Sequence, residues 1–277
     1  METFAGVLVT IDGWVDNKAD ELIMAGEGAG KTRLLFLGND YNPISITCLD
    51  ALATDCRLEV IAGIYHPTNR GLLPVLRKSW SQYGGGFVAR RGFDLLLSWV
   101  RIRLRKAHIA LSGYRSMQEL VLARRLQRFE FRNINSVEAI GRLRSLCPDI
   151  IAVAAFSQIL KFPVITAASL ACINVHPSLL PKHRGPNPFY WVLRNQESYS
   201  GVTVHHIEEG IDSGDIILQE KIPLETGMTE HSLRDRSSHV AARLLLEAVR
   251  LVRSGDIPRI KQDEAAAAYD PLPPRGS

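Results

Sequence analysis

The sequence predicts a doubly wound α/β domain built on a mostly parallel sheet, and three observations carry this prediction. The apolar run DIIAVAAF at 149–156 is typical of a central parallel strand, because such a strand is buried on both faces. Residues 33–65 read as strand, helix and strand, which is how a parallel sheet begins. Strand-like and helix-like patterns then alternate as far as a long amphipathic helix at 230–255, which Gly255 closes.

The first strand–helix–strand unit has clear local signals. RLLFLG at 33–38 is short and apolar and ends at Gly38. The segment 43–53 has apolar residues at helical spacing, with Pro43 in its first turn. LEVIAGIY at 58–65 is the second strand.

The middle of the chain begins with an insertion at 66–115 and continues with a helix at 116–127. Ser116 and Glu119 have the spacing of a capping box at the start of that helix. The elements expected next are a strand at 129–134, a helix at 135–146 and the strand at 149–156.

The last third completes the predicted sheet. Its expected elements are strands at 171–176, 200–207 and 215–224 and helices at 186–195 and 230–255. This order predicts one Rossmann-like, doubly wound domain at 33–256, between an N-terminal extension, 1–32, and a C-terminal tail, 257–277. The tail is rich in alanine and proline, and we expect it to wrap the surface.

Composition excludes several classes of protein. Apolar residues make up 46% and charged residues 22%, as in ordinary soluble proteins. The net charge of +4 suits an anionic ligand and is too small to indicate nucleic acid by itself. No signal peptide is evident, and arginines interrupt the most apolar stretch, 93–106, so it is not a membrane span. The scattered cysteines predict a reduced, cytoplasmic chain with buried thiols; they are Cys48, Cys56, Cys147 and Cys172.

The stretch AGEGAGKT at 25–32 resembles a phosphate-binding loop, although Ala25 stands where the first glycine is required. A working loop of this kind follows a strand and opens a helix. Here the stretch precedes the first predicted strand. A flexible joint is therefore expected, with a nucleotide-binding protein as the alternative.

Reactive side chains gather after two predicted strands. Asn174 and His176 alternate along a strand and so share a face. HHIEEGIDSGD at 205–215 places Asp212 in a glycine-flanked turn. An amide, an imidazole and a carboxylate suit acyl transfer, because they can stabilise an oxyanion and exchange protons. Polar caps on the sheet and a histidine metal site are the alternatives, although the histidines lack metal-ligand spacing.

The motifs INVHPSLLPKHRGPNP and GVTVHHIEEGIDSGDIIL resemble the formyltransferase family that uses 10-formyltetrahydrofolate. This family includes the methionyl-tRNA, glycinamide ribonucleotide and sugar N-formyltransferases. The resemblance covers roughly residues 33–260 and is weakest in the insertion. The tail sequence KQDEAAAAYDP also resembles a segment that follows the catalytic domain in the tRNA enzymes.

The resemblance implies roles for particular residues. The catalytic residues would be Asn174, His176 and Asp212, with support from His205, Ser178, Arg184 and Gly185. The pterin of 10-formyltetrahydrofolate would bind largely to backbone groups of Phe156, Ser157, Gln158, Ile159, Leu160, Glu208, Glu209, Gly210 and Ile211. The acceptor amine would attack the formyl carbon, Asn174 and protonated His176 would stabilise the oxyanion, and Asp212 would help to remove the amine proton. This chemistry needs no metal and no ATP.

The acceptor is less clear from the sequence. Family enzymes that act on tRNA carry a second domain of about a hundred residues, whereas this sequence runs 65 residues past Asp212. GNDYNPIS at 38–45 lacks the Gly/Ser-rich phosphate loop of the glycinamide ribonucleotide enzymes. We therefore expect a small amine, such as a nucleotide-linked amino sugar. A methionyl-tRNA formyltransferase-like enzyme with a reduced C-terminus, and a 10-formyltetrahydrofolate hydrolase, are the alternatives.

Basic residues of the insertion offer a contact for an anionic acceptor; they are Arg77, Lys78, Arg90 and Arg91. The basic segment 93–106 is expected to have a solvated face beside an apolar face that packs on the domain. Binding to RNA, to a phosphate-bearing substrate or to a membrane surface is the alternative. The oligomeric state does not follow from the sequence.

Overall fold

The structure is a computed structural model, and it describes residues 30–65, residues 113–274 and a few helical positions between them. Those positions are Phe93, Leu96, Leu97, Val100, Arg101 and Arg103. The basic residues proposed to contact an acceptor lie outside the described residues, as does nearly all of the extension at 1–32. The predictions made for them therefore remain predictions.

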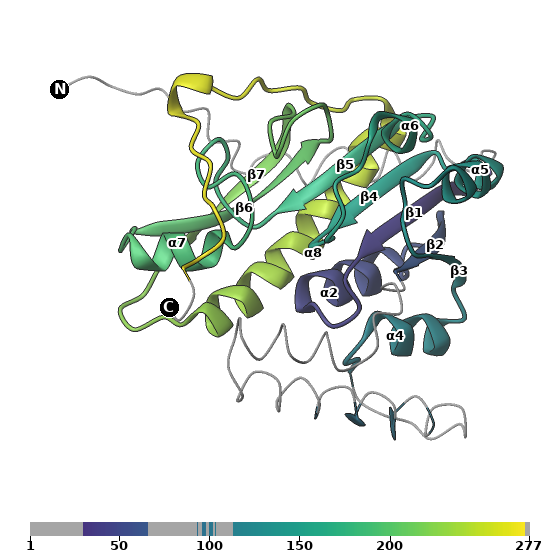
Figure 1. Cartoon of the computed structure of the whole chain (residues 1–277), viewed down its shortest axis with the longest axis horizontal. Coiled ribbons are helices and arrows are strands. Elements are labelled where there is room, and N and C mark those ends of the chain that lie inside the picture. The colour runs from purple at the N-terminus through teal and green to yellow at the C-terminus, as the bar shows by residue number, and fades with distance from the viewer. Residues whose placement is uncertain are drawn as a thin grey trace, which may run out of the picture. The chain divides into compact units, whose positions relative to one another are not determined.

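A seven-stranded sheet forms the centre of the unit that begins at Thr32 (Figure 1). The strand order is β3-β2-β1-β4-β5-β6-β7. The strands are β1 (Thr32–Gly38), β2 (Leu58–Tyr65), β3 (Gln127–Phe131), β4 (Ile150–Ala154), β5 (Ala171–His176), β6 (Tyr199–His206) and β7 (Ile216–Pro223). The pairs from β3 to β5 are parallel, whereas β6 runs antiparallel to both of its neighbours. The strand order reverses between β1 and β4, the kind of position beside which open α/β sheets bind ligands.

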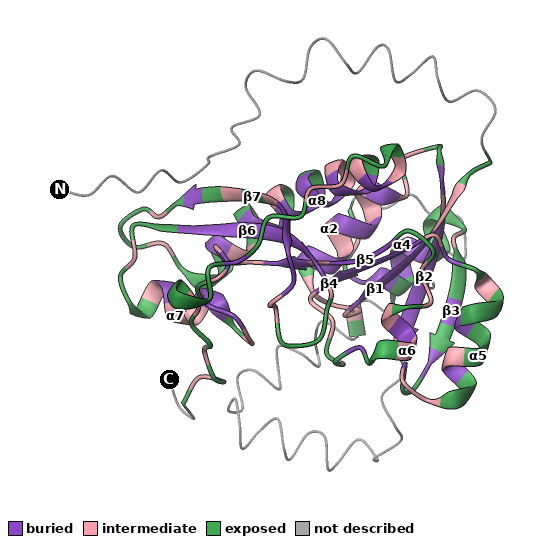
Figure 2. Ribbon diagram, turned by 90° about the horizontal axis from the view of Figure 1, so that it is seen from above, coloured by how far each residue is buried: buried purple, intermediate pink, exposed green. Residues whose placement is uncertain are grey.

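Helices cover both faces of this sheet, which confirms the predicted doubly wound α/β class (Figures 1 and 2). The described helices are α2 (Pro43–Leu52), α4 (Met117–Arg124), α5 (Val137–Leu146), α6 (Phe162–Ile165), α7 (Pro188–Arg194), α8 (Glu230–Ser254) and the 3₁₀ turn η2 (Glu264–Ala266). Alternate residues of β1 feed two cores. Leu34 and Phe36 pack with α2 and α8, whereas Leu35 and Leu37 pack with α5 and α6.

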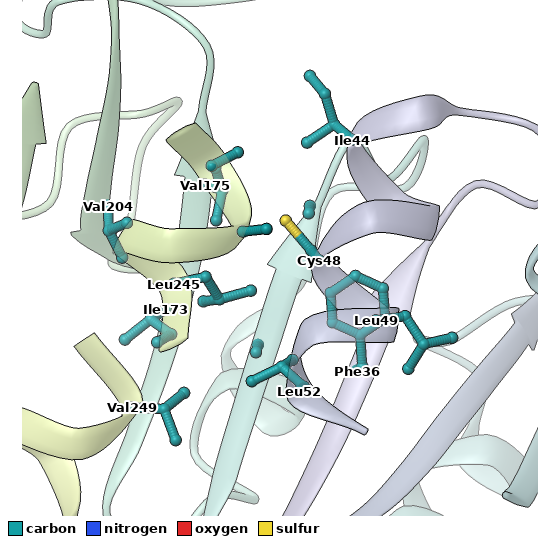
Figure 3. Packing of buried hydrophobic residues seen from close by; sticks show 14 of the residues in the cluster. Phe36, Ile44, Cys48, Leu49, Leu52, Ile173, Val175, Val204, Leu245 and Val249 are labelled. Atoms are coloured by element: carbon teal, nitrogen blue, oxygen red, sulfur yellow. The ribbon is translucent and has the colours of Figure 1, made fainter. Parts of the chain in front are cut away.

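The core between α2, α8 and the sheet is continuous. Figure 3 shows the Cys48 thiol on the side of α2 that faces α8, and Cys48 belongs to the same core cluster as Leu245 of α8 and Phe36 of β1. Burial raises the pKa of Cys172 to about 12 and that of Cys48 still further. The expectation of buried thiols holds for these two cysteines and is wrong for Cys56 and Cys147, which are exposed free thiols.

Element boundaries differ from the sequence prediction around α4. Arg125 takes the left-handed conformation, with a φ of 54°, and ends the helix there. Gln127, predicted to be the last helical residue, consequently begins β3. Ser116 caps the helix as expected by accepting a hydrogen bond from the Glu119 amide. The carboxylate of Glu119 departs from the expected box, since it accepts from the Arg115 amide and pairs with Arg101.

The end of the glycine-rich stretch leads into a strand, as the position of the motif implied. Thr32 is the first residue of β1, and its hydroxyl accepts a hydrogen bond from Arg253 Nε at 2.9 Å. Gly30 and Lys31 therefore do not open a helix. The helix N-terminus that a phosphate loop requires is missing at this position.

The described part of the C-terminal tail is mostly exposed, as expected for a segment that wraps the surface, and it runs beside the two sequence motifs. Ile260 forms an antiparallel bridge with Ile216 at the start of β7, and Tyr269 forms a parallel bridge with Arg184. Between these bridges, Gln262 is buried. Within the described ranges, no helix is both long enough and apolar enough to cross a membrane.

Candidate active site

Asn174 and His205 face each other across the antiparallel pair β5–β6. The sequence placed these motifs at two strand ends, but the register pairs Asn174 directly with His205 within the strands. Residues opposite each other in an antiparallel pair project to the same face. Asn174 Nδ2 consequently lies 3.1 Å from His205 Nε2.

Only one neutral tautomer of the His205 ring can form hydrogen bonds with both of its neighbours. Its Nδ1 lies 2.8 Å from the His206 carbonyl oxygen, which can only accept a hydrogen bond, so Nδ1 carries the proton. The unprotonated Nε2 then accepts from the Asn174 amide. His205 therefore fixes which way the Asn174 amide points.

His176 is buried beside this pair and is held by the loop that follows β5. Its Nε2 donates to the His183 carbonyl oxygen at 2.8 Å, which leaves Nδ1 facing Asp212 Oδ2 at 3.5 Å. Burial lowers the pKa of His176 below its usual value, and the Asp212 charge only partly opposes this effect. The neutral imidazole is therefore favoured near pH 7. Protonated His176, which the family resemblance implied, is not the favoured resting form.

Asp212 joins the two motifs. Its carboxylate accepts from the Gly185 amide through Oδ2 at 2.9 Å, and Oδ1 lies 3.5 Å from Asn174 Nδ2. Burial raises the pKa of Asp212, but His176, His205 and the Gly185 amide outweigh it and hold that pKa below the ordinary range. The carboxylate is therefore ionised at the centre of the cluster.

The predicted supporting residues lie around this cluster, each with a definite contact. Ser178 Oγ donates to the Lys182 carbonyl oxygen and so braces the loop that holds His176. Gly185 presents its amide to Asp212, and a Cβ at this position would lie 2.7 Å from the Asp270 carbonyl oxygen. The guanidinium of Arg184 binds Gln262 and Glu264 of the tail rather than the catalytic cluster.

The predicted cofactor-binding residues after β4 divide into buried and exposed positions. Leu160 is buried, and Phe156 stacks edge-on against Phe131. The side chain of Gln158 binds the backbone of the loop that follows β3, where it accepts from the Ile134 amide. Ser157 and Ile159 are exposed. Ser157 and Ile159 are therefore the most accessible side chains at 156–160, and Phe156 and Gln158 are partly accessible.

The second predicted cofactor segment, 208–211, forms the first half of the turn that carries Asp212. Glu208 pairs with Arg259 of the tail, and Gly210 has a φ of 115°, which favours glycine. Glu209 is exposed, and its carbonyl oxygen accepts from Ser213. Ile211 is 44% exposed. Asp215, which follows this turn, is buried and pairs with Arg259 and Lys261.

Sequence reasoning missed three residues of this neighbourhood. His183 holds His176 through its carbonyl oxygen, and its ring lies between Asp270 and Glu197, at 2.6 and 2.7 Å. Gln262 joins the tail to both motifs. The only signal for Gln262 and Asp270 was the resemblance of KQDEAAAAYDP to a family segment, and that resemblance gave no role. No group of three or more potential metal ligands occurs among the residues that the structure describes.

Comparison with known proteins identifies the family. The formyl transferase family model matches residues 105–249, which is more than half of the chain. The chain therefore belongs to the formyl transferase family.

Individual relatives agree with this assignment, and a solved structure shares the fold. The methionyl-tRNA formyltransferase of Clostridioides difficile is 37% identical over 160 residues, covering 58% of this chain and 52% of the relative. That of Syntrophus aciditrophicus is 45% identical over 130 residues, covering 47% of this chain and 42% of the relative. The chain thus spans about half the length of the curated relatives that it matches. An N-formyltransferase from Helicobacter canadensis, solved with folinic acid and dTDP-3-aminofucose, shares the fold, with a TM-score of 0.56 and 18% identity over 86% of this chain and 70% of that one.

Proposed function

We propose that this protein transfers a formyl group from 10-formyltetrahydrofolate to a primary amine. The observation that carries the proposal is the convergence of Asn174, His176 and Asp212 from two separate motifs. Asp212 Oδ2 lies 3.5 Å from His176 Nδ1, and Asp212 Oδ1 lies 3.5 Å from Asn174 Nδ2. An oriented amide donor beside a buried imidazole–carboxylate pair is suited to acyl transfer to an amine.

The loops beside this cluster fit the polar edge of a pterin. The backbone amides of 156–160 and 208–211 donate no hydrogen bond to another described residue. Ile207, which opens the second loop, and Phe156 of the first pack in the same hydrophobic cluster. The two loops therefore present backbone donors around a shared apolar base, as a ligand with an apolar body and a polar edge requires. Bound there, 10-formyltetrahydrofolate supplies the formyl carbon that the amine attacks.

Asn174 is the group placed to stabilise the oxyanion that develops on the formyl oxygen. One of its amide hydrogens is held by His205, and the other is directed toward Asp212 at the long distance of 3.5 Å. A contact as long as 3.5 Å is weak, so this hydrogen is available for a shorter bond to the formyl oxygen as that oxygen gains charge. Because the His205 ring fixes the amide plane, this donor needs little reorganisation during the reaction.

The His176–Asp212 pair is placed to carry the proton that moves in the reaction. Neutral His176 accepts the proton of the attacking amine on Nδ1, since Nε2 is already committed to the His183 carbonyl oxygen. The Asp212 carboxylate stabilises the resulting imidazolium. His176 then returns the proton to the folate nitrogen as its bond to the formyl carbon breaks. Overall, an amide forms on the acceptor, and tetrahydrofolate leaves.

The relatives favour methionyl-tRNA as the acceptor to test first. Identity to two methionyl-tRNA formyltransferases is 37% over 160 residues and 45% over 130 residues, whereas the N-formyltransferase from Helicobacter canadensis shares 18% and indicates the fold alone. The small, nucleotide-linked amine expected from the sequence is the second candidate, because it requires the same attack by a primary amine.

One assay tests the reaction and its acceptor together. The protein is mixed with 10-formyltetrahydrofolate alone, with methionyl-tRNA, or with a dTDP-linked amino sugar, and tetrahydrofolate release is followed. Release that depends on one amine supports the proposal and names its acceptor. Equal release without any amine would replace it with hydrolysis, in which water takes the place of the amine. No release in any mixture would refute the proposed reaction.

A further inference from the structure

Gln262 connects the tail to both catalytic motifs through a single amide group. Its Nε2 donates to the Asp212 carbonyl oxygen at 2.9 Å and to the Gly214 carbonyl oxygen at 2.7 Å. Its Oε1 accepts from Arg184 Nη2 at 2.8 Å and from Arg184 Nε at 3.1 Å. Only 9% of Gln262 is exposed, so these bonds are shielded from water. Both the oxygen and the nitrogen of the Gln262 amide therefore bind the loops that form the site.

The backbone that Gln262 holds is strained. Asp212 has a φ of 51°, in the left-handed region that a non-glycine residue enters at a cost. Such a conformation persists only where surrounding contacts enforce it. The Asp212 side chain is fixed by Gly185, while its own carbonyl oxygen is fixed by Gln262. The side chain of Asp212 is thus held by the first motif, and its backbone is held by the tail.

The tail around Gln262 is anchored on both sides. Before it, Ile260 and Ile216 exchange backbone hydrogen bonds at 2.8 and 3.0 Å. After it, the Asp270 amide donates to the Arg184 carbonyl oxygen, and the Arg184 amide donates to the Ala268 carbonyl oxygen, both at 2.8 Å. Glu264 also pairs with Arg184, but its side chain is 70% exposed, so this pair contributes little. Gln262 is therefore a buried side chain within a strap that backbone bonds and ion pairs hold on both sides.

We propose that Gln262 is a positioning residue that holds the Asp212 turn against the Arg184–Gly185 loop, so that the Asp212 carboxylate meets His176 and Asn174. It touches no reacting atom and acts through Asp212. The kinetic part of this inference rests on the proposed formyl transfer, whereas the geometric part does not. The tail is thereby part of the catalytic unit rather than an appendage to it.

Two substitutions separate the two halves of the Gln262 amide. Gln262→Met keeps the length and removes every hydrogen bond. Gln262→Glu keeps an acceptor for Arg184 but turns a carboxylate toward two carbonyl oxygens, which repel it. If holding the turn is what matters, both variants lose activity. If attachment of Arg184 is what matters, Gln262→Glu remains active. Gln127→Met, on an exposed position of β3, is the matched control.

Steady-state kinetics with 10-formyltetrahydrofolate and methionyl-tRNA give the first readout. We expect kcat to fall about 10- to 100-fold in both Gln262 variants, because displacements near 1 Å cost rates of this order. The KM for each substrate and the melting temperature should change far less than kcat, and Gln127→Met should match the wild type. Wild-type kcat in Gln262→Glu, or a change confined to KM, would overturn the proposal.

Amide exchange at Gly185 gives a readout that needs no substrate. The Gly185 amide is protected by Asp212 Oδ2, so releasing the turn should expose it. We expect its hydrogen exchange, measured by NMR in the free protein, to be at least about tenfold faster in both Gln262 variants than in Gln127→Met. Unchanged protection would overturn the proposal even if the protein transfers formyl groups. Faster exchange in a protein without transferase activity would instead retain the positioning role and reject the proposed function.

Discussion

Asn174 Nδ2 lies 3.1 Å from His205 Nε2, across an antiparallel pair in which the two residues stand directly opposite each other. The hydrogen bond links a candidate oxyanion donor to a ring whose tautomer is set by the His206 carbonyl oxygen. A strand pairing thus determines the direction in which a reactive amide points, and the first prediction follows from this arrangement.

Asn174→Ala should lower kcat by about 10²- to 10³-fold, the usual cost of removing one oxyanion donor. The affinity for 10-formyltetrahydrofolate should change little, since the proposed folate contacts are backbone groups of other loops. His205→Phe should lower kcat by a smaller factor, because the amide remains but loses its orientation. Steady-state kinetics on both variants make the comparison. A larger effect for His205→Phe than for Asn174→Ala would contradict the roles given to the pair.

Asp212→Asn should lower kcat by about 10²- to 10⁴-fold, the range typical of acid–base groups. The substitution keeps the size of the side chain but removes the charge that stabilises an imidazolium at His176. Glu138→Gln, at an exposed position in the first turn of α5, is the matched control for loss of one carboxylate. Near-wild-type turnover of Asp212→Asn would remove this carboxylate from the proton path.

Mild acid should destabilise the protein partly through His176. Burial lowers the pKa of His176 in the folded state, while in the unfolded chain it returns to about 6.5. Below that pH the unfolded chain binds more protons than the folded one, so stability falls as the pH falls toward the folded-state pKa. Melting temperatures between about pH 7.5 and 5.5 should therefore drop less steeply in His176→Asn than in the wild type. If the melting temperature falls equally steeply with pH in the two proteins, His176 does not titrate as described.

His206 contributes in the same direction, because burial, followed by the charge of Arg259, also lowers its pKa. Asp212 acts at lower pH, since its pKa is already held below the ordinary range. The comparison between the wild type and His176→Asn isolates one group of the three.

Two glycines should respond to alanine in opposite ways. A Cβ on Gly214 would collide with the His206 carbonyl oxygen, so Gly214→Ala must shift the Asp212 turn and lower both stability and kcat. A Cβ on Gly141, inside α5, meets nothing within 4 Å. Gly141→Ala should therefore raise the free energy of unfolding by about 0.5–1 kcal/mol without changing kcat. Chemical denaturation and kinetics on both variants check this contrast.

Much of the fold was predictable because its signals are local. The continuous apolar run of β4 and the amphipathic pattern of α8 can each be recognised from neighbouring residues in the sequence. The predicted helix extended three residues beyond the end of α4, because no sequence pattern indicates that Arg125 adopts the left-handed conformation. The short helix α6 also went unpredicted.

The sequence predicted which residues form the candidate site, but it did not predict how they are arranged in space. Motif spacing selected Asn174, His176 and Asp212, yet nothing local shows that β6 runs antiparallel to β5. The contribution of Gln262 depends on bonds to residues 48 to 78 positions away, which sequence patterns do not record. The exposure of Cys56 and Cys147 likewise depends on tertiary context.

Transfer of radiolabelled formyl from 10-formyltetrahydrofolate to methionyl-tRNA, compared between the wild type and Asp212→Asn, tests the central claim most directly. The account predicts labelled, amide-linked formyl on the acceptor with the wild type and at most about a hundredth of that rate with Asp212→Asn. Labelled formate as the main product, or equal transfer by the two proteins, would contradict it.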